Sequence, residues 1–106
     1  ILSFLISSPI NYPIEIYEKI RLENAVEEIN SAINIINKVP ISSFKDSLMH
    51  YVKERNIKLG TFMKSLRFAL VGNLTGPDLF DIINLLDKKE CIKRFNNYIE
   101  FLKGLS

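Results

Sequence analysis

Apolar residues recur every three or four positions along most of this chain, and no stretch alternates apolar and polar residues with a period of two. The first spacing is typical of amphipathic helices, whereas strict alternation would indicate strands. The first stretch with helical spacing covers residues 14–37, leaves open a break near Arg21, and ends at Lys38-Val39-Pro40. Its apolar positions are Ile16, Ile20, Ala25, Val26, Ile29, Ile33 and Ile36. We expect these residues to be buried, because five glutamates line the opposite face.

A second helix is predicted to begin after Ser42 or Ser43, either of which is a suitable cap. Asp46 lies three residues after Ser43, which makes a variant of the capping box. The apolar stripe of this helix consists of Phe44, Leu48, Tyr51 and Val52. Arg55-Asn56 is expected to close it.

A third helix is predicted from Thr61, with Gly72 as the left-handed residue that ends it. Its apolar stripe consists of Phe62, Met63, Leu66, Ala69 and Leu70. Lys64 and Arg67 fall on another face, one helical turn apart. These two cations lead directly into a short polar loop.

After that loop, Pro77 is predicted as the first residue of a fourth helix, since its missing N–H costs nothing there. Asp78 and Asp81 would then complement the helix dipole. Apolar residues cover most sides of this helix, so we expect it to be central; they are Leu79, Phe80, Ile82, Ile83, Leu85 and Leu86. Asp87 is predicted to cap a last helix over residues 88–103, whose inward residues would be Ile92, Phe95, Ile99, Phe101 and Leu102.

These elements together predict an all-α fold, a compact cage or bundle of about five to six helices. One domain of 106 residues is expected, with a composition (47% hydrophobic, 25% charged) ordinary for a globular protein. Residues 1–13 contain two prolines and are interpreted as the end of a preceding subdomain, which makes the chain a piece of a longer protein. Their apolar run is shorter than the roughly 20 residues that cross a bilayer and has no basic start, so we expect neither a membrane span nor a secretory signal.

Charge is distributed unevenly along the chain. Residues 1–44 carry three cations and five acids, whereas residues 45–106 carry eleven cations and seven acids. Within residues 45–67 the balance is six cations against two acids. A basic surface of this size suits a polyanionic partner, although solvated helix faces alone would also explain it.

The sequence shows no arrangement typical of catalysis. His50 is the only histidine and has no nucleophile at a telling spacing, and no glycine-rich phosphate loop is present. Cys91 is the only cysteine, so we expect a core position for it, no disulfide, and a reducing, cytoplasmic setting. One cysteine and one histidine do not make a tetrahedral zinc site. We therefore expect no catalytic residue, metal or cofactor in this chain.

The segment from Lys58 to Phe80 reads KLGTFMKSLRFALVGNLTGPDLF. It resembles the "L-R-x-A-L-x-G … P-x-L-F" stretch of the C-terminal anticodon-binding domain of bacterial-type glutamyl-tRNA synthetases. The positions that carry the resemblance are Lys58-Leu59-Gly60, Leu66-Arg67, Ala69-Leu70, Gly72, Pro77, Leu79-Phe80, Leu85-Leu86, Lys88 and Arg94. Phe4-Leu5 and Tyr12 match the start of that domain more weakly.

The resemblance implies an all-helical cage whose far end grips the anticodon loop of the tRNA for glutamate. The parent would be a class I ligase that uses ATP and Mg²⁺, held in its catalytic domain, to attach glutamate to that tRNA. Arg67 matches the arginine that reaches the first anticodon base, and Gly76, Pro77 and Leu79 match residues that line the pockets for the first two bases. We expect a monomer in which the cations nearest the backbone phosphates are Lys53, Arg55, Lys58 and Lys64.

Some positions depart from the family pattern. Ser65 stands where proline is usual, Gly76 where threonine is common, and Ile41 where tryptophan is frequent, and Asp87-Lys88-Lys89 replaces Gly-Lys-Glu. Any hydroxyl contact at Gly76 is therefore lost.

Simpler roles for the same residues stay open. Arg67 could pair with Asp78 or Asp81, Pro77 could only start a helix, and Leu79 could only fill the core. The whole chain could equally be a structural or protein-interaction helical domain with a basic face.

Overall fold

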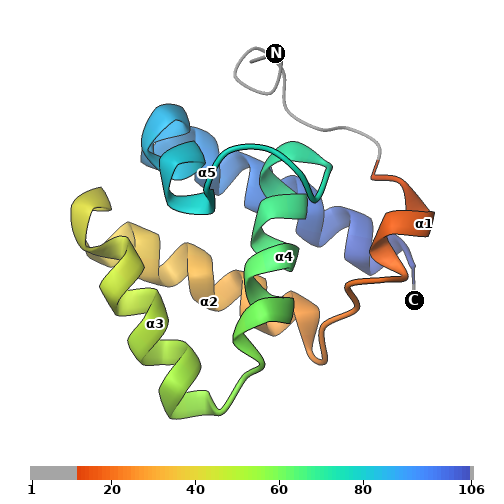
Figure 1. The fold of residues 1–106 in the computed structure, drawn as a ribbon, viewed down its shortest axis with the longest axis horizontal. Coiled ribbons are helices and arrows are strands. Elements are labelled where there is room, and N and C mark those ends of the chain that lie inside the picture. Colours follow the sequence, from red (N-terminus) through yellow and green to blue (C-terminus); the bar gives the residue numbers. More distant parts are fainter. Residues whose placement is uncertain (1–11, 106) are drawn as a thin grey trace.

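The structure, a computed structural model, describes residues 12–105, and within that range every regular element is a helix (Figure 1). The elements are α1 (Ile14–Tyr17), α2 (Ala25–Lys38), the 3-10 helix η2 (Ile41–Ser43), α3 (Phe44–Arg55), α4 (Leu59–Val71) and α5 (Leu79–Gly104). The all-α prediction is confirmed. Phe4 and Leu5 lie outside the described residues.

The stretch 14–37 is not one helix. The chain leaves helical geometry after Tyr17 and re-enters it at Ala25, so the break that the sequence left open near Arg21 is real. Ile20 lies buried inside the break, and the hydroxyl of Ser65 on α4 donates a hydrogen bond to the Ile20 carbonyl at 3.3 Å. A contact between segments distant in sequence therefore holds the non-helical connection.

The predicted start of α3 directly after Ser43 is confirmed, but the predicted side-chain cap at Ser43 and the predicted place of Pro77 are wrong. The side chain of Ser43 makes no capping hydrogen bond, because a 3-10 turn precedes α3 instead. Pro77 lies in the loop rather than in the helix, and Asp78 takes the capping position by accepting from the Phe80 amide at 3.0 Å. A carboxylate cap at Asp78 satisfies a free amide of the first turn, so the helix begins after it.

Two other boundaries agree with the sequence. Gly72 follows α4 with a φ of 70°, the left-handed geometry predicted for it. Asp87 interrupts α5 with a φ of 67° and accepts from the Glu90 amide at 3.1 Å, so it caps the second half of that helix as predicted.

Helix α5 lies at the centre of the fold, with α2 and α4 packed against it (Figure 1). Four aromatic rings meet at the second half of α5, with centroids 5.1 to 5.8 Å apart; they are Tyr12, Phe68, Tyr98 and Phe101. Lys88 donates to the Val39 carbonyl at 2.9 Å and so ties the end of α2 to α5. The second half of α5 therefore forms the fixed platform on which α4 rests.

Single residues with open roles are also placed. Cys91 is fully buried, as predicted, and burial raises the pKa of its thiol to about 12. His50 is exposed on α3, and its Nε2 lies 2.5 Å from a carboxylate oxygen of Glu54. Among residues 12–105, none of the helices combines the length and apolar character needed to span a bilayer.

Candidate nucleic-acid interface

The candidate loop, residues 72–78, joins the end of α4 to the start of α5 and lies on the surface. It begins at left-handed Gly72, and the Asn73 side chain then accepts from the Leu74 amide at 2.7 Å. Gly76 has a φ of 128°, a conformation that side-chain-bearing residues rarely adopt. The loop thus presents small residues and backbone groups at one end of α4.

Arg67 reaches across to this loop from the last turns of α4. Its guanidinium donates a hydrogen bond from Nη1 to the Pro77 carbonyl. A Cβ placed on Gly76 would lie 3.9 Å from the same nitrogen, so Gly76 borders it directly. The alternative pairing with Asp78 or Asp81 is not formed, since neither carboxylate makes an ion pair with Arg67 in the described chain.

The four residues predicted to read bases do not all occupy the surface. The half-buried Arg67 meets the exposed residues Gly76 and Pro77 at one spot on the surface. Leu79 is only 4% exposed and belongs to the core beneath that spot. Its part in any contact is therefore to support the loop from below.

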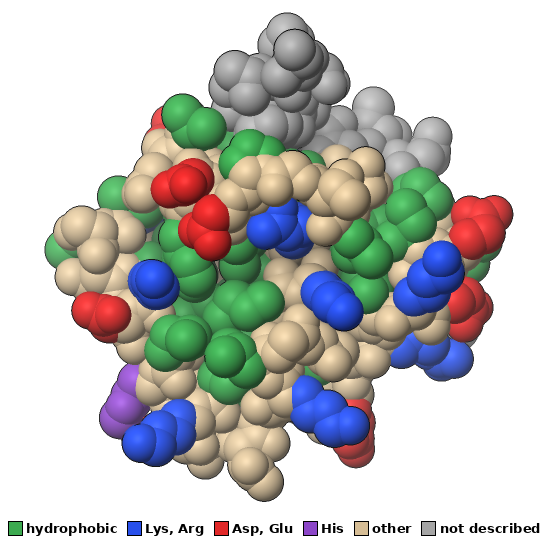
Figure 2. Space-filling model, viewed as in Figure 1, with side chains coloured by type: hydrophobic (Ala, Val, Ile, Leu, Met, Phe, Trp, Pro, Cys, Tyr) green, Lys and Arg blue, Asp and Glu red, His purple; other side chains and the backbone are tan. Residues whose placement is uncertain are grey.

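The four predicted phosphate contacts fall into two groups. Lys64 is exposed on α4, one turn from Arg67. Lys53, Arg55 and Lys58 lie at the opposite end of α4, and Lys58 comes nine residues before Arg67, a rise of about 14 Å along a helix. Figure 2 shows that the lysine and arginine side chains on this face are scattered among apolar, neutral and acidic side chains rather than gathered in one patch.

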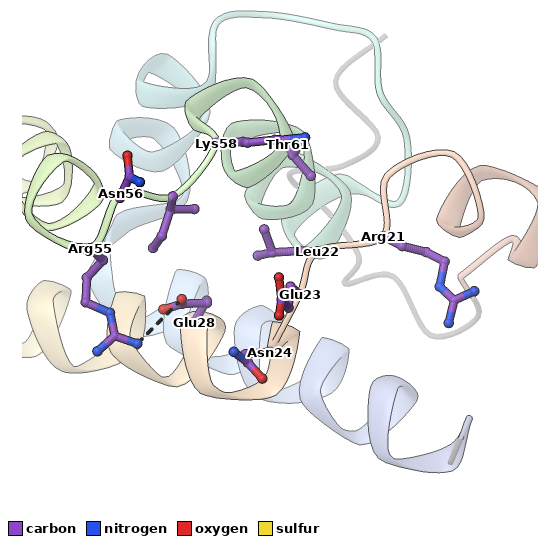
Figure 3. A pocket seen from close by; sticks show the side chains of 10 residues that line it. Arg21, Leu22, Glu23, Asn24, Glu28, Arg55, Asn56, Lys58 and Thr61 are labelled. Atoms are coloured by element: carbon purple, nitrogen blue, oxygen red, sulfur yellow. Dashed lines mark ion pairs between the residues drawn. The ribbon is translucent and has the colours of Figure 1, made fainter.

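Two members of the second group, Arg55 and Lys58, border a pocket of about 510 Å³ between the α1–α2 and α3–α4 connections (Figure 3). Arg55 points into it and pairs with Glu28 at 3.8 Å, whereas Arg21 points away and pairs with Glu18. Glu28 is 5% exposed and also accepts from the Tyr51 hydroxyl. Burial, followed by this bond to Glu28, raises the pKa of Tyr51. Arg55 therefore has an acidic partner within the protein, while 53% of its side chain stays exposed.

Lys45 belongs to the basic stretch 45–67, but the sequence did not predict that it lies near the candidate loop. Its ammonium lies 5.5 Å from the centre of the Phe80 ring, in the first turn of α5 after the candidate loop. Only the packing of α3 against α5 brings the two together, and no local spacing signals it. Among the described residues, no group of three His, Cys, Asp or Glu side chains is arranged to hold a metal.

Comparison with known proteins places this geometry in a family. The family model described as "Anticodon binding domain" matches residues 1–99 of the chain. The chain belongs to the anticodon-binding domain family. The match includes α2 to α4, the candidate loop and most of α5 of this anticodon-binding domain.

Relatives of this domain are glutamate–tRNA ligases. A ligase of Amoebophilus asiaticus (strain 5a2) is 30% identical over 90% of this chain and 19% of its own length. One from Synechococcus sp. (strain JA-2-3B'a(2-13)) is 34% identical over 81% of this chain and 19% of its own. The chain spans about a fifth of the length of these curated relatives.

A solved structure agrees with these relatives. The crystal structure of a glutamate tRNA ligase from Elizabethkingia meningosepticum CCUG26117, in complex with its amino acid, matches with a TM-score of 0.86 and 26% identity. The match covers 92% of this domain and 20% of that chain. Family membership and this likeness favour the anticodon-binding hypothesis over a general interaction domain.

Proposed function

We propose that this anticodon-binding domain recognises the anticodon loop of the tRNA for glutamate. It would do so as part of a glutamate–tRNA ligase that attaches glutamate to its tRNA, acts as a monomer in the cytoplasm, and holds ATP and Mg²⁺ in its catalytic domain. The observation that carries the proposal is the convergence of Arg67 with Gly76 and Pro77 on one exposed spot.

Arg67 is suited to reading a base because its guanidinium is planar and has five N–H donors. The Pro77 carbonyl takes one of these donors and fixes the plane of the group, which leaves the others for a base edge. Splayed bases of single-stranded RNA are recognised through such edges and through flat apolar contacts. The exposed Pro77 ring supplies a flat surface, and Gly76 leaves room for a base to approach the backbone.

Lys64 is the cation best placed to hold the RNA backbone near that spot. Lys58 and Lys53 would contact phosphates farther along, toward the other end of α4. Arg55 would contribute less to RNA affinity, because its guanidinium forms an ion pair with Glu28. With about three phosphates engaged at once, affinity should fall with a log–log salt slope of about −2 to −3.

The test is binding of an anticodon stem-loop of the glutamate tRNA, with a stem-loop of scrambled loop sequence as the control. We expect the cognate RNA to bind more tightly, and we expect amide chemical-shift changes around residues 64–80. Equal affinity for both RNAs, or shift changes confined to α2, would contradict the proposal. The salt slope measured on the same RNAs checks the number of phosphate contacts.

A further inference from the structure

Buried polar side chains hold the C-terminal end of α4, just before the candidate loop. An α-helix leaves the carbonyl groups of its last turn without partners inside the helix. Here the Phe68 carbonyl accepts from the Gly72 amide at 2.8 Å. The Ala69 carbonyl accepts from the Tyr12 hydroxyl at 2.8 Å, and the Leu70 carbonyl accepts from the Arg94 guanidinium at 3.0 Å. We call Tyr12 and Arg94 the α4 clasp.

Arg94 is an unusual residue in this position because it is charged and only 1% exposed. Its Nε donates to the Glu90 carboxylate at 2.8 Å, and its Nη1 donates to the Leu70 carbonyl. A buried ion pair is weak evidence for stability, since apolar residues of similar volume often serve as well. A cation at the negative end of a helix dipole, bonded to one particular carbonyl, instead fixes where that helix end lies.

The clasp acts on the part of α4 that presents the RNA site. Leu70 comes three residues after Arg67 and two before Gly72, where the candidate loop begins. Both clasp residues lie outside α4 and the loop, with Tyr12 before α1 and Arg94 on the second half of α5. The clasp therefore sets the end of α4 against the rigid platform of α5, and with it the distance from Arg67 to the Pro77 carbonyl.

We propose that Arg94, assisted by Tyr12, is a positioning residue for base recognition by Arg67. The inference rests on the proposed function and deepens it. Arg94 touches no RNA in this account, because it is buried. It holds the last turn of α4 so that Arg67 and the candidate loop stay in register before RNA arrives.

The experiment uses the 106-residue chain and two stem-loop RNAs, one with the cognate anticodon and one with its first base changed. Arg94→Met keeps the length of the side chain but removes its donors and charge. Ile29→Ala, at a fully buried position on α2, is the matched control for general loss of stability. Affinities are measured below the unfolding transition of every variant, and amide shifts of Gly72 and Gly76 are recorded without RNA.

We expect Arg94→Met to lose about tenfold in cognate affinity, the size expected for one lost recognition hydrogen bond. It should also lose most of its base preference and shift the Gly72 and Gly76 amides. Ile29→Ala should keep the preference and these shifts even where its melting temperature falls as far. Arg94→Lys, which retains a donor and the charge, should recover part of the affinity.

If Arg94→Met fails to fold, Tyr12→Phe decides, because it removes only the hydroxyl on the Ala69 carbonyl. A smaller loss of base preference in that variant supports the inference. Unchanged preference in a folded clasp variant, or an equal loss in Ile29→Ala, overturns it. If the unaltered chain itself does not distinguish the two RNAs, the proposed function fails; if it does and Arg94→Met does too, only this inference fails.

Discussion

Basic residues lie near both ends of α4, but the arginines at the two ends have different partners. At the C-terminal end, Arg67 is bonded to a neutral backbone carbonyl beside small, exposed loop residues. Near the N-terminal end, Arg55 on α3 forms a 3.8 Å ion pair with the buried carboxylate of Glu28, and its guanidinium lies 5.7 Å from the centre of the Tyr51 ring. A carbonyl orients a guanidinium without cancelling its charge, whereas a carboxylate does both.

This contrast means that a count of cations along the sequence does not locate a nucleic-acid site. Arg55 and Arg67 look equivalent in the sequence, because both lie in the basic stretch 45–67. Both guanidinium groups reach the surface, but only Arg55 has a carboxylate partner, whereas Arg67 is bonded to a neutral carbonyl. The pocket at the other end is lined by Glu23 and Glu28 together with three cations, so its two carboxylates weaken the attraction for an anionic ligand there.

The largest expected effect is the loss of RNA recognition in Arg67→Ala. If Arg67 contacts a base edge, its removal should cost about 1–3 kcal/mol of binding and relax the preference at that base. Arg55→Ala should cost less than half of this and leave base preference unchanged. The measurement is affinity for stem-loops that differ only in the first anticodon base.

A measurement of stability distinguishes a base-reading role of Arg67 from a purely structural one. Its bond to the Pro77 carbonyl lies at the surface, so we expect Arg67→Ala to lower the free energy of unfolding by no more than about 1 kcal/mol. Thermal unfolding of the same sample provides the check. A strongly destabilised domain that still prefers the same base would make Arg67 a brace for the loop.

The next effect in size concerns the opposite end, where Glu28→Ala should lower stability by about 1–2 kcal/mol. The change leaves the Tyr51 hydroxyl and the Arg55 guanidinium without their buried acceptor. It also frees a cation, so affinity for any stem-loop should rise slightly at low salt, with no change in base preference. Unfolding by urea measures the first effect, and a salt titration of binding measures the second. A fall in base preference here would remove the distinction between the two ends.

The longer helices α2 to α5 could be predicted because each buries apolar residues that recur with the helical period. The break between α1 and α2 could be suspected but not placed, since it depends on the bond from Ser65 to the Ile20 carbonyl, 45 positions away. The cap of α3 and the start of α5 were mispredicted for a similar reason, because several residues in each segment can satisfy the first amides. Cap geometry chooses among them only once the loop is folded.

The sequence named candidate residues for the site but not the bonds among them. Spacing and family resemblance singled out Arg67, Gly76 and Pro77, whereas the sequence offered Asp78 and Asp81 as partners of Arg67 and gave no hint of the Pro77 carbonyl. Arg94 matched the family pattern without any suggested role. A charged residue is buried only through its partners, and the carbonyl that Arg94 holds is 24 residues away in the chain.

The smallest expected effects come from the lysines. Because a lysine carries charge without a planar donor set, its removal tests phosphate contact at each end of α4 separately from base reading. Lys64→Ala, beside Arg67, should weaken all stem-loops alike by less than about 1 kcal/mol and lower the steepness of the salt slope by about one unit. Lys53→Ala, an exposed cation near the opposite end, is the matched control and should have a smaller uniform effect. Both variants should keep their melting temperatures within error, because surface substitutions typically change stability by less than about 0.5 kcal/mol. Affinity measured at several salt concentrations for cognate and scrambled stem-loops checks this. If Lys53→Ala weakened binding more than Lys64→Ala, the RNA backbone would run along the N-terminal end of α4, and the contrast between the two ends would be wrong.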